Sequence, residues 1–274
     1  MRVTFCGSLD IHRPDYQNIE KNLKALIKTM AIAHSDFVLR NIDNIPNPEI
    51  IPVDTIIGEA LASLQATNPN KPVNVTIFCE PGTHPNPPAN LKYSPFTAST
   101  TNRVQFYQEL LALVDLVVGI GGQQGLLRLS ISCEWLGKPI LILPGSGGTS
   151  ELLWEELFVK SYQVANLPSK LKNELRQLPY INQPLIDYSS TTYSTIKKFY
   201  RAASKNKKPL DQAIINSNNI TIATLRKSIQ RFSIGLWLLL ISAFISIIST
   251  SYYIGSLHIF DSSSRSSSNT GTPP

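Results

Sequence analysis

Two strand–glycine loop–helix units follow one another closely in this 274-residue chain. The first is DLVVGIGGQQG at Asp115–Gly125, and the second is KPILILPGSGGT at Lys138–Thr149. In each unit a β-branched apolar run ends in glycines, and a stretch of helical character follows. Backbone N–H groups are left free where a helix begins, and glycine lets an anion approach them closely. Two such units, spaced as neighbouring strands of a parallel sheet, predict a site for a phosphorylated nucleotide.

The rest of the amino-terminal half alternates in the same way between strand-like and helix-like segments. This alternation predicts an α/β fold, a Rossmann-like doubly wound parallel sheet whose ligands bind beyond the carboxyl ends of the strands. The other expected strands are Arg2–Cys6, Phe37–Leu39 and Val73–Cys79. The expected helices are Ile19–Ala33, a helix capped by Asp54 or Thr55 that runs to Gln65, Asn102–Val114, Gln124–Leu136 and Thr149–Val159. Gly7-Ser8 is expected to start a turn, and residues 41–52 and 80–100 are expected to be loops.

Charge is unevenly distributed along the chain, whose net charge is +6. The basic excess lies between Lys197 and Arg231, whereas the preceding part is close to neutral. A nucleic-acid-binding domain would carry its basic residues on the folded face, so we expect no nucleic-acid partner. The three cysteines lie in or beside apolar runs without metal-ligand spacing, which predicts buried thiols and no metal site.

A long uncharged segment near the end of the chain predicts a single membrane span. Residues 232–256 are mostly apolar, and 24 residues without a charge, Phe232–Gly255, are enough to cross a hydrocarbon core of ~30 Å. Basic residues precede this span and few charges follow it, so the positive-inside rule places the amino-terminal domain in the cytoplasm. The opening MRVTFCGS also reads as a strand rather than a signal peptide. A buried core helix is the alternative interpretation of the span.

These observations predict four regions. Residues 1–165 form the nucleotide-binding domain, and 166–231 form a helical, basic juxtamembrane connector, with helices at Leu167–Leu178, Thr191–Ala203 and Ile220–Arg231. The membrane helix occupies 232–256, and the serine-rich tail 257–274 is expected to be disordered. The expected location is the inner (cytoplasmic) membrane.

Three segments carry a resemblance to a known family. VTFCGSLDIHRPDY resembles the first strand and Gly-Ser turn of the LONELY GUY (lysine-decarboxylase-like) proteins, and NRVQFYQELLALVDLVVGIGGQQG resembles their arginine-bearing helix, strand and glycine loop. LGKPILILPGSGG is similar to the next strand and loop of the wider SLOG superfamily. The resemblance covers roughly residues 1–160. It implies a Rossmann-like domain that either cleaves nucleotide monophosphates or binds nucleotide-derived signals, in some members within membrane-linked antiphage systems.

The resemblance also implies roles for particular residues. Gly7 and Ser8 match the first turn, Arg103 matches the helix arginine, and Gly121, Gly122 and Gly125 match the main glycine loop. The enzymatic relatives continue that loop into a catalytic glutamate, where this chain has Arg128 and Leu129. The glycine-rich turn after their second strand is replaced here by Arg40-Asn41. We therefore expect binding rather than hydrolysis, with no catalytic residue assigned and Asp10, Glu80 and Glu151 left as candidate carboxylates.

The candidate site combines both glycine loops with the residues carried over from the family. A plain strand-to-helix turn, a helix cap and a surface arginine are the structural alternatives for its members. No cofactor and no metal is expected. The expected ligand-binding residues are Gly7, Ser8, Arg103, Gly121, Gly122, Gln123, Gln124, Gly125, Gly145, Ser146, Gly147, Gly148 and Thr149.

Three functions remain open on these grounds. The first is a membrane-anchored sensor that binds a nucleotide-derived signal, such as a cyclic nucleotide or an ADP-ribose derivative, and couples it to a transmembrane effector. Its partners would be a nucleotide-like small molecule, the lipid bilayer and further copies of the chain, because one apolar helix cannot form a pore alone. The second is a membrane-tethered nucleotide or N-glycoside hydrolase. The third is a ligand-free scaffold.

Overall fold

The computed structural model describes residues 1–40, 49–69, 73–160, 164, 166–184 and 187–205, with side chains omitted for 155–160. Its centre is one sheet whose strands run in the order β5-β4-β2-β1-β6-β7, and all of these pair in parallel. A further short strand, β3, pairs antiparallel with the second half of β1. The strands are β1 (Arg2–Asp10), β2 (Asp36–Arg40), β3 (Ile50–Pro52), β4 (Val75–Cys79), β5 (Ser94–Thr97), β6 (Leu116–Gly121) and β7 (Ile140–Ile142).

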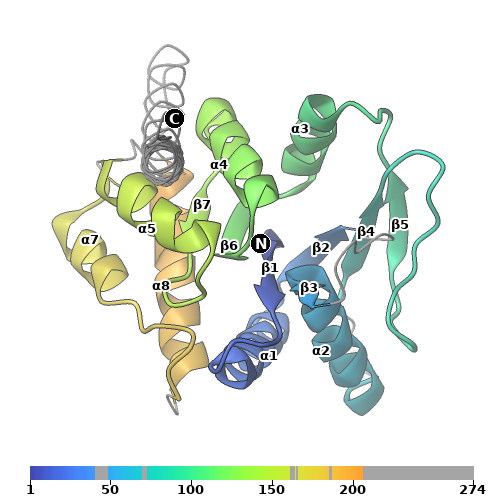
Figure 1. Cartoon of the computed structure of the whole chain (residues 1–274), viewed down its shortest axis with the longest axis horizontal. Helices are drawn as coiled ribbons and strands as arrows, with labels where there is room; N and C mark the ends of the chain where they lie inside the picture. The colour runs from blue at the N-terminus through green and yellow to red at the C-terminus, as the bar shows by residue number, and fades with distance from the viewer. Residues whose placement is uncertain (41–48, 70–72, 161–163, 165, 185–186, 206–274) are drawn as a thin grey trace, which may run out of the picture. The chain divides into compact units, whose positions relative to one another are not determined.

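Helices cover both faces of this sheet, which confirms the Rossmann-like α/β class. Figure 1 shows α1 and α2 on one side of the sheet and α3 and α4 on the other. Helix α5 packs against β6 and β7, and α8 packs against α1. The helices are α1 (Tyr16–Ile32), α2 (Val53–Thr67), α3 (Arg103–Leu113), α4 (Gln124–Leu136), α5 (Thr149–Lys160), α7 (Ser169–Arg176) and α8 (Tyr188–Ala203).

The core lies between the sheet and these helices. All six residues of β6 are buried, as expected for an inner parallel strand covered on both faces. Helix α1 buries Leu23, Leu26, Ile27 and Met30, whose spacing of three and four places them on one face. The three cysteines are buried thiols, as expected from the sequence, and burial raises the pKa of Cys6 and of Cys133.

Three local predictions are wrong. Gly7-Ser8 does not start a turn, because β1 continues through both residues to Asp10 with β6 on one side and β3 on the other. The predicted loops also contain strands, Ile50–Pro52 in the first and Ser94–Thr97 in the second. Each of these strands is short and contains proline, so its sequence resembles a loop until a neighbouring strand supplies the hydrogen bonds.

The start of α2 also differs from the expectation that Asp54 or Thr55 caps it. Pro52 occupies the N-cap position without a side-chain cap, and the Asp54 carboxylate instead accepts hydrogen bonds from Arg40. Its Oδ1 lies 2.8 Å from the backbone nitrogen of Arg40, and its Oδ2 pairs with the Arg40 guanidinium. Although burial alone would lower the pKa of Arg40, the adjacent Asp54 carboxylate outweighs it and raises that pKa. Arg40 thus joins β2 to α2.

Helices α7 and α8 confirm two of the three helices expected after residue 166. Helix α8 buries Tyr188, Ile196 and Phe199, so this segment contributes to the core around α1. The third expected helix, Ile220–Arg231, the span 232–256 and the tail 257–274 lie outside the described residues. Among the helices that are described, none is both long and apolar enough to cross a membrane. The four-region division stays a prediction.

Candidate functional site

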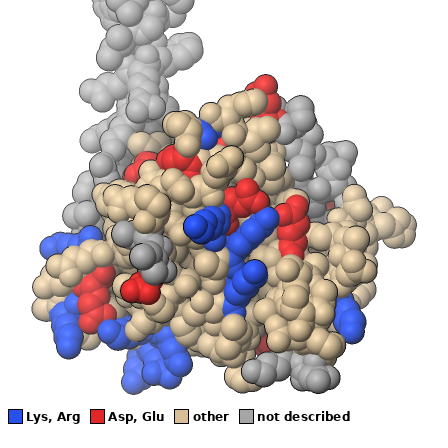
Figure 2. Space-filling model, turned by 90° about the horizontal axis from the view of Figure 1, so that it is seen from below, with Lys and Arg blue, Asp and Glu red and all other residues tan. Residues whose placement is uncertain are grey.

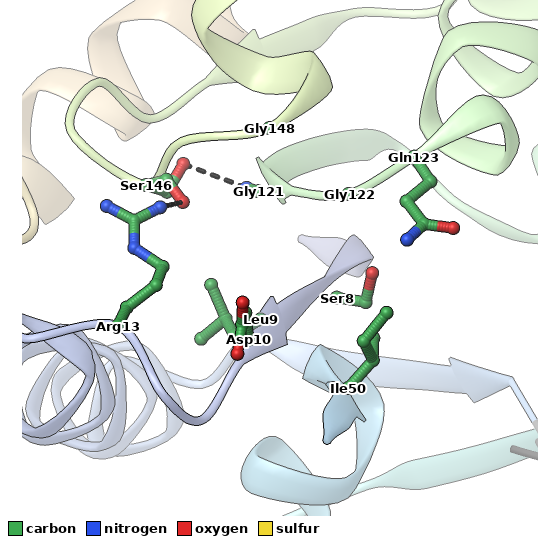
Figure 3. A pocket seen from close by; sticks show the side chains of 10 residues that line it. All are labelled: Ser8, Leu9, Asp10, Arg13, Ile50, Gly121, Gly122, Gln123, Ser146 and Gly148. Atoms are coloured by element: carbon green, nitrogen blue, oxygen red, sulfur yellow. Dashed lines mark hydrogen bonds between the residues drawn. The ribbon is translucent and has the colours of Figure 1, made fainter. Parts of the chain in front are cut away.

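The topological switch point of the sheet lies at β1. Strand β2 pairs with one side of β1 and β6 with the other, so the chain connections diverge there. A cavity of about 270 Å³ opens at the carboxyl ends of β1 and β6, where ligands of doubly wound sheets bind (Figure 3). Its lining comes from β1, the turn before α1, β3 and the two glycine loops. The lining residues are Ser8, Leu9, Asp10, Arg13, Ile50, Gly121, Gly122, Gln123, Ser146 and Gly148.

The glycines around the cavity let three backbone segments approach one another. Gly7 has a φ of 144°, and a Cβ there would overlap the carbonyl oxygen of Ile120 in β6. Gly148 has a φ of 61°, and a Cβ there would lie 2.5 Å from the carbonyl oxygen of Gly122. Both positions therefore require glycine for backbone packing, whether or not a ligand is bound.

The first glycine loop keeps only part of its amides available. The Gly121 nitrogen donates to the Ser146 hydroxyl at 2.8 Å, and the Gly122 nitrogen donates to the Ser8 carbonyl at 2.9 Å. The next three amides, those of Gln123, Gln124 and Gly125, donate to no group within the described part of the chain. They form the amino end of α4, so unpaired donors and the positive end of the helix dipole coincide beside the cavity.

In the second glycine loop, backbone amides are already hydrogen-bonded within the protein. The nitrogens of Gly145 and Gly147 both donate to Glu151 Oε1, at 3.1 and 3.3 Å. The nitrogen of Thr149 donates to the carbonyl of Gly122 at 3.0 Å. The expectation of free amides here is wrong for these three residues. A carboxylate six positions after Gly145 accepts from the first two, and the backbone of the first loop accepts from Thr149.

Ser146 joins the two loops through its buried hydroxyl. This hydroxyl accepts from Gly121, donates to the Leu143 carbonyl at 3.0 Å and lies 2.7 Å from the Ser150 hydroxyl. Its hydrogen bonds are therefore used within the protein, and the residue fixes the distance between the strands β6 and β7 at their ends.

Arg13 is a site residue that sequence reasoning missed. Its Nε and Nη2 donate to the Asp15 carboxylate at 2.9 and 2.8 Å, and its Nη1 donates to the Ser146 carbonyl (Figure 3). The hydrogen bond from Arg13, with a further one from Asn182, lowers the pKa of Asp15. The only available signal was its position in HRPDY, directly after the first strand, where side chains face the carboxyl edge of the sheet.

The fixed guanidinium also explains Gly147, because a Cβ at that position would overlap Arg13. Asn182 belongs to the segment after α7, which is held to α1 a second time. The Asn22 side chain donates to the carbonyls of Ile181 and Gln183 at 2.8 and 2.7 Å. The segment that leads into α8 is thus anchored next to the cavity wall.

The structure brings together about half of the predicted site. Six of the predicted residues line the cavity, namely Ser8, Gly121, Gly122, Gln123, Ser146 and Gly148. Six others lie in the same segments without lining it, namely Gly7, Gln124, Gly125, Gly145, Gly147 and Thr149. Arg103 lies elsewhere, in the first turn of α3, where the Asn102 side chain caps the helix. Its guanidinium is mostly exposed and pairs with Glu80 at the end of β4.

The three candidate carboxylates are separated in the same way. Glu80 is paired with Arg103, and Glu151 is bonded to the second loop. Asp10 alone of the three lines the cavity. In the described residues no group of histidines, cysteines and carboxylates is arranged to hold a metal ion.

Comparisons with known proteins leave the function open. No protein-family model matches the sequence, and a search of curated proteins finds no match. Among solved structures the chain is similar to the X-ray structure of TM1055, a structural genomics target. The two share 17% sequence identity with a TM-score of 0.42, over 56% of this chain and 80% of the other. A likeness of this extent carries no argument about function, so the function is argued from the cavity.

Proposed function

We propose that this protein binds a phosphorylated, nucleotide-type small molecule in the cavity at the carboxyl ends of β1 and β6. The observation that carries the proposal is the coincidence of this cavity with the three unpaired amides of Gln123, Gln124 and Gly125. Amides at the amino end of a helix, with the dipole behind them, favour a phosphate group. Gln123 belongs both to the cavity lining and to this group of donors, so a phosphate there would extend the ligand into the cavity.

The size of the cavity restricts what it holds. A volume of about 270 Å³ is close to the lower end of the ~300–1,000 Å³ that small-molecule sites span. It accommodates a sugar and a phosphate more readily than a whole nucleotide, so the base would extend out of the cavity. Arg13 adds positive charge at the opposite wall, although Asp15 already engages two of its three nitrogens.

The chain as a whole fits a membrane-anchored sensor better than a free binding protein. The apolar segment 232–256 and the basic residues before it support anchoring to the cytoplasmic leaflet, where each Lys or Arg near anionic lipid contributes about 1 kcal/mol. In this function, ligand binding in the cytoplasmic domain changes the association of several copies, since one span cannot enclose a pore. A role in antiphage defence extends this proposal by family resemblance.

Nucleic acid is a poorer candidate partner on surface grounds. The face shown in Figure 2 carries Asp and Glu side chains among its Lys and Arg side chains rather than one broad basic surface. A nucleic-acid-binding face concentrates positive charge along one side.

The test uses the full-length chain in detergent with AMP, ADP-ribose and 3′,5′-cyclic AMP as probes, measured by calorimetry and thermal shift. At least one probe is expected to bind and to raise the melting temperature. Gly125→Asp places a carboxylate beside the three amides and is expected to weaken binding at least about tenfold, which is ~1.4 kcal/mol. Gly82→Asp, at a position with no atom near the added Cβ, is the control. Unchanged affinity in Gly125→Asp would refute the proposed phosphate position.

One observation favours a hydrolase as the second candidate. Cleavage of an N-glycosidic bond needs a carboxylate that activates water or stabilises the developing sugar cation, and Asp10 lines the cavity. Incubation of the full-length chain with AMP or NAD, followed by chromatography, decides between the two. Release of the free base that Asp10→Asn abolishes would favour the hydrolase, and intact nucleotide after long incubation would favour the sensor.

A further inference from the structure

Asp10 ends β1 with its backbone fixed on both sides. Strand β3 pairs with it through Ile50, and the backbone nitrogen of Arg13 donates to its carbonyl at 3.4 Å. The backbone nitrogen of His12 donates to the carboxylate oxygen Oδ1 at 2.9 Å, which orients the carboxylate. Figure 3 shows this carboxylate between Arg13 and Ser8, among the residues that line the cavity.

The second carboxylate oxygen of Asp10 has no partner within the described part of the chain. Arg13 is the cation of the cavity lining, and its guanidinium is held by Asp15 and by the carbonyl of Ser146 rather than by Asp10. An acceptor of full negative charge is thus presented to whatever enters the cavity. It repels a phosphate group and favours a neutral hydroxyl donor, to which it can make a short charge-assisted hydrogen bond.

The cavity therefore has two chemically opposite ends. The amino end of α4 offers N–H donors through Gln123 and the residues after it, and Asp10 offers an acceptor. A ligand that satisfies both carries a phosphate and hydroxyl groups separated by a few atoms. A ribose 5-phosphate unit has this arrangement, with the 2′ and 3′ hydroxyls on the side away from the phosphate.

We propose that Asp10 is the specificity-determining residue that recognises the 2′,3′-diol of a ribonucleotide, so that the site distinguishes ribonucleotides from ligands lacking these hydroxyls. This inference rests on the proposed function and names the ligand class of the same cavity. The two hydroxyls donate to the carboxylate of Asp10 while the phosphate accepts from the α4 amides. A 2′,3′-dideoxy ligand loses both of these charge-assisted hydrogen bonds to Asp10.

The experiment compares AMP with 2′,3′-dideoxy-AMP by calorimetry on the full-length chain in detergent. The wild type is expected to bind AMP at least about tenfold more tightly. Asp10→Ala is expected to bind the two ligands with equal affinity. Asp10→Asn retains an acceptor for the His12 nitrogen and, should Asp10→Ala fail to fold, is expected to reduce the preference by removing the charge. The matched control is Asp36→Asn, at the amino end of β2, where the preference is expected to be unchanged.

The outcomes separate this inference from the proposed function. If neither ligand binds the wild type, the proposed function fails and the inference with it. If both bind equally, or if the preference for AMP survives in both Asp10 variants, the diol inference alone is overturned. A preference that chelation of divalent cations with EDTA abolishes would also overturn it, because Asp10 would then hold a metal ion rather than the sugar.

Discussion

The two glycine loops have nearly the same sequence character and different hydrogen bonding. In the second loop, the amides of Gly145 and Gly147 donate to Glu151, a residue in the first turn of the helix that follows. In the first loop, Gly121 and Gly122 use their amides to hold neighbouring segments, and the amides at the start of α4 have no partner in the described chain. The first turn of α4 contains no acidic residue.

This difference shows that a glycine loop predicts an anion site only together with the residues of the following turn. A carboxylate at the right position satisfies the amides and complements the helix dipole from within the chain. Where that carboxylate is missing, the same backbone geometry is available to an external anion. We therefore place the proposed ligand at the first loop, whereas the amides of the second loop are bonded within the protein.

The largest expected effect is a loss of stability when a glycine that packs against backbone is replaced. Gly148→Ala forces a Cβ to within 2.5 Å of the Gly122 carbonyl at a φ of 61°, so we expect a loss of about 3 kcal/mol or more in the free energy of unfolding. Urea titration of the full-length chain measures this. The control Gly82→Ala has a φ of 79° and open space around the added Cβ, and is expected to lose only about 1 kcal/mol. Equal losses in the two variants would contradict the packing role.

The second prediction concerns the internal carboxylate of the second loop. Glu151→Ala removes the acceptor of two amides and is expected to lower the free energy of unfolding by about 1–2 kcal/mol. The vacated amides are then expected to bind inorganic phosphate, so phosphate stabilises the variant more than it stabilises the wild type. The measurement is the melting temperature across a phosphate series. Identical phosphate dependence in variant and wild type would show that the second loop is no anion site even when vacated.

The third prediction concerns Gly125, which lies in α4 with no positive φ and has only ordinary van der Waals space around an added Cβ. Gly125→Ala is expected to leave stability unchanged or to raise it by up to about 1 kcal/mol, since alanine favours helix. The same methyl group hinders close approach of a phosphate, so we expect severalfold weaker nucleotide binding. A variant that is destabilised but binds normally would show that Gly125 serves packing rather than binding.

The smallest expected effect is the pH dependence that arises from Asp15. The hydrogen bond from Arg13 lowers its pKa below the ordinary value of 3.8, so the ionised carboxylate contributes stability above that pH. This contribution begins to be lost as the pH falls to about 3.8, the ordinary pKa. It is fully lost once the pH is below the lower pKa that Asp15 has in the folded protein. In Asp15→Asn it is absent, so the stability difference from the wild type is expected to shrink as the solution is acidified. A constant difference between neutral and acid pH in urea titrations would show that the carboxylate charge is not what matters.

The fold was predictable from the sequence where apolar periodicity is strong. The strand Val75–Cys79 and the helix Gln124–Leu136 were found because burial on one or both faces dictates their residue pattern. The strands Ile50–Pro52 and Ser94–Thr97 were missed, because their hydrogen bonds come from partners distant in sequence. Short edge segments of this kind carry no periodicity of their own.

The site was predictable only in its position. Glycines after two inner strands correctly indicated the edge of the sheet where the cavity lies. Which amides are satisfied depends on side chains such as Glu151 and Ser146, whose directions are set by the folded loop. Arg13 and Asp10 were undervalued for the same reason, because nothing in the sequence gives the distance between the turn after β1 and the loop after β7.

The Asp15 carboxylate has two partners that belong to different parts of the molecule, the cavity residue Arg13 and Asn182 in the segment that leads into α8. A ligand that draws Arg13 away from Asp15 changes the bonding of a residue that also holds this exit segment. By thermodynamic reciprocity, if such a ligand changes the affinity of this segment for a binding partner, that partner changes the affinity of the cavity for the ligand by the same factor. One shared carboxylate therefore connects the cavity residue Arg13 to the segment that leads into α8.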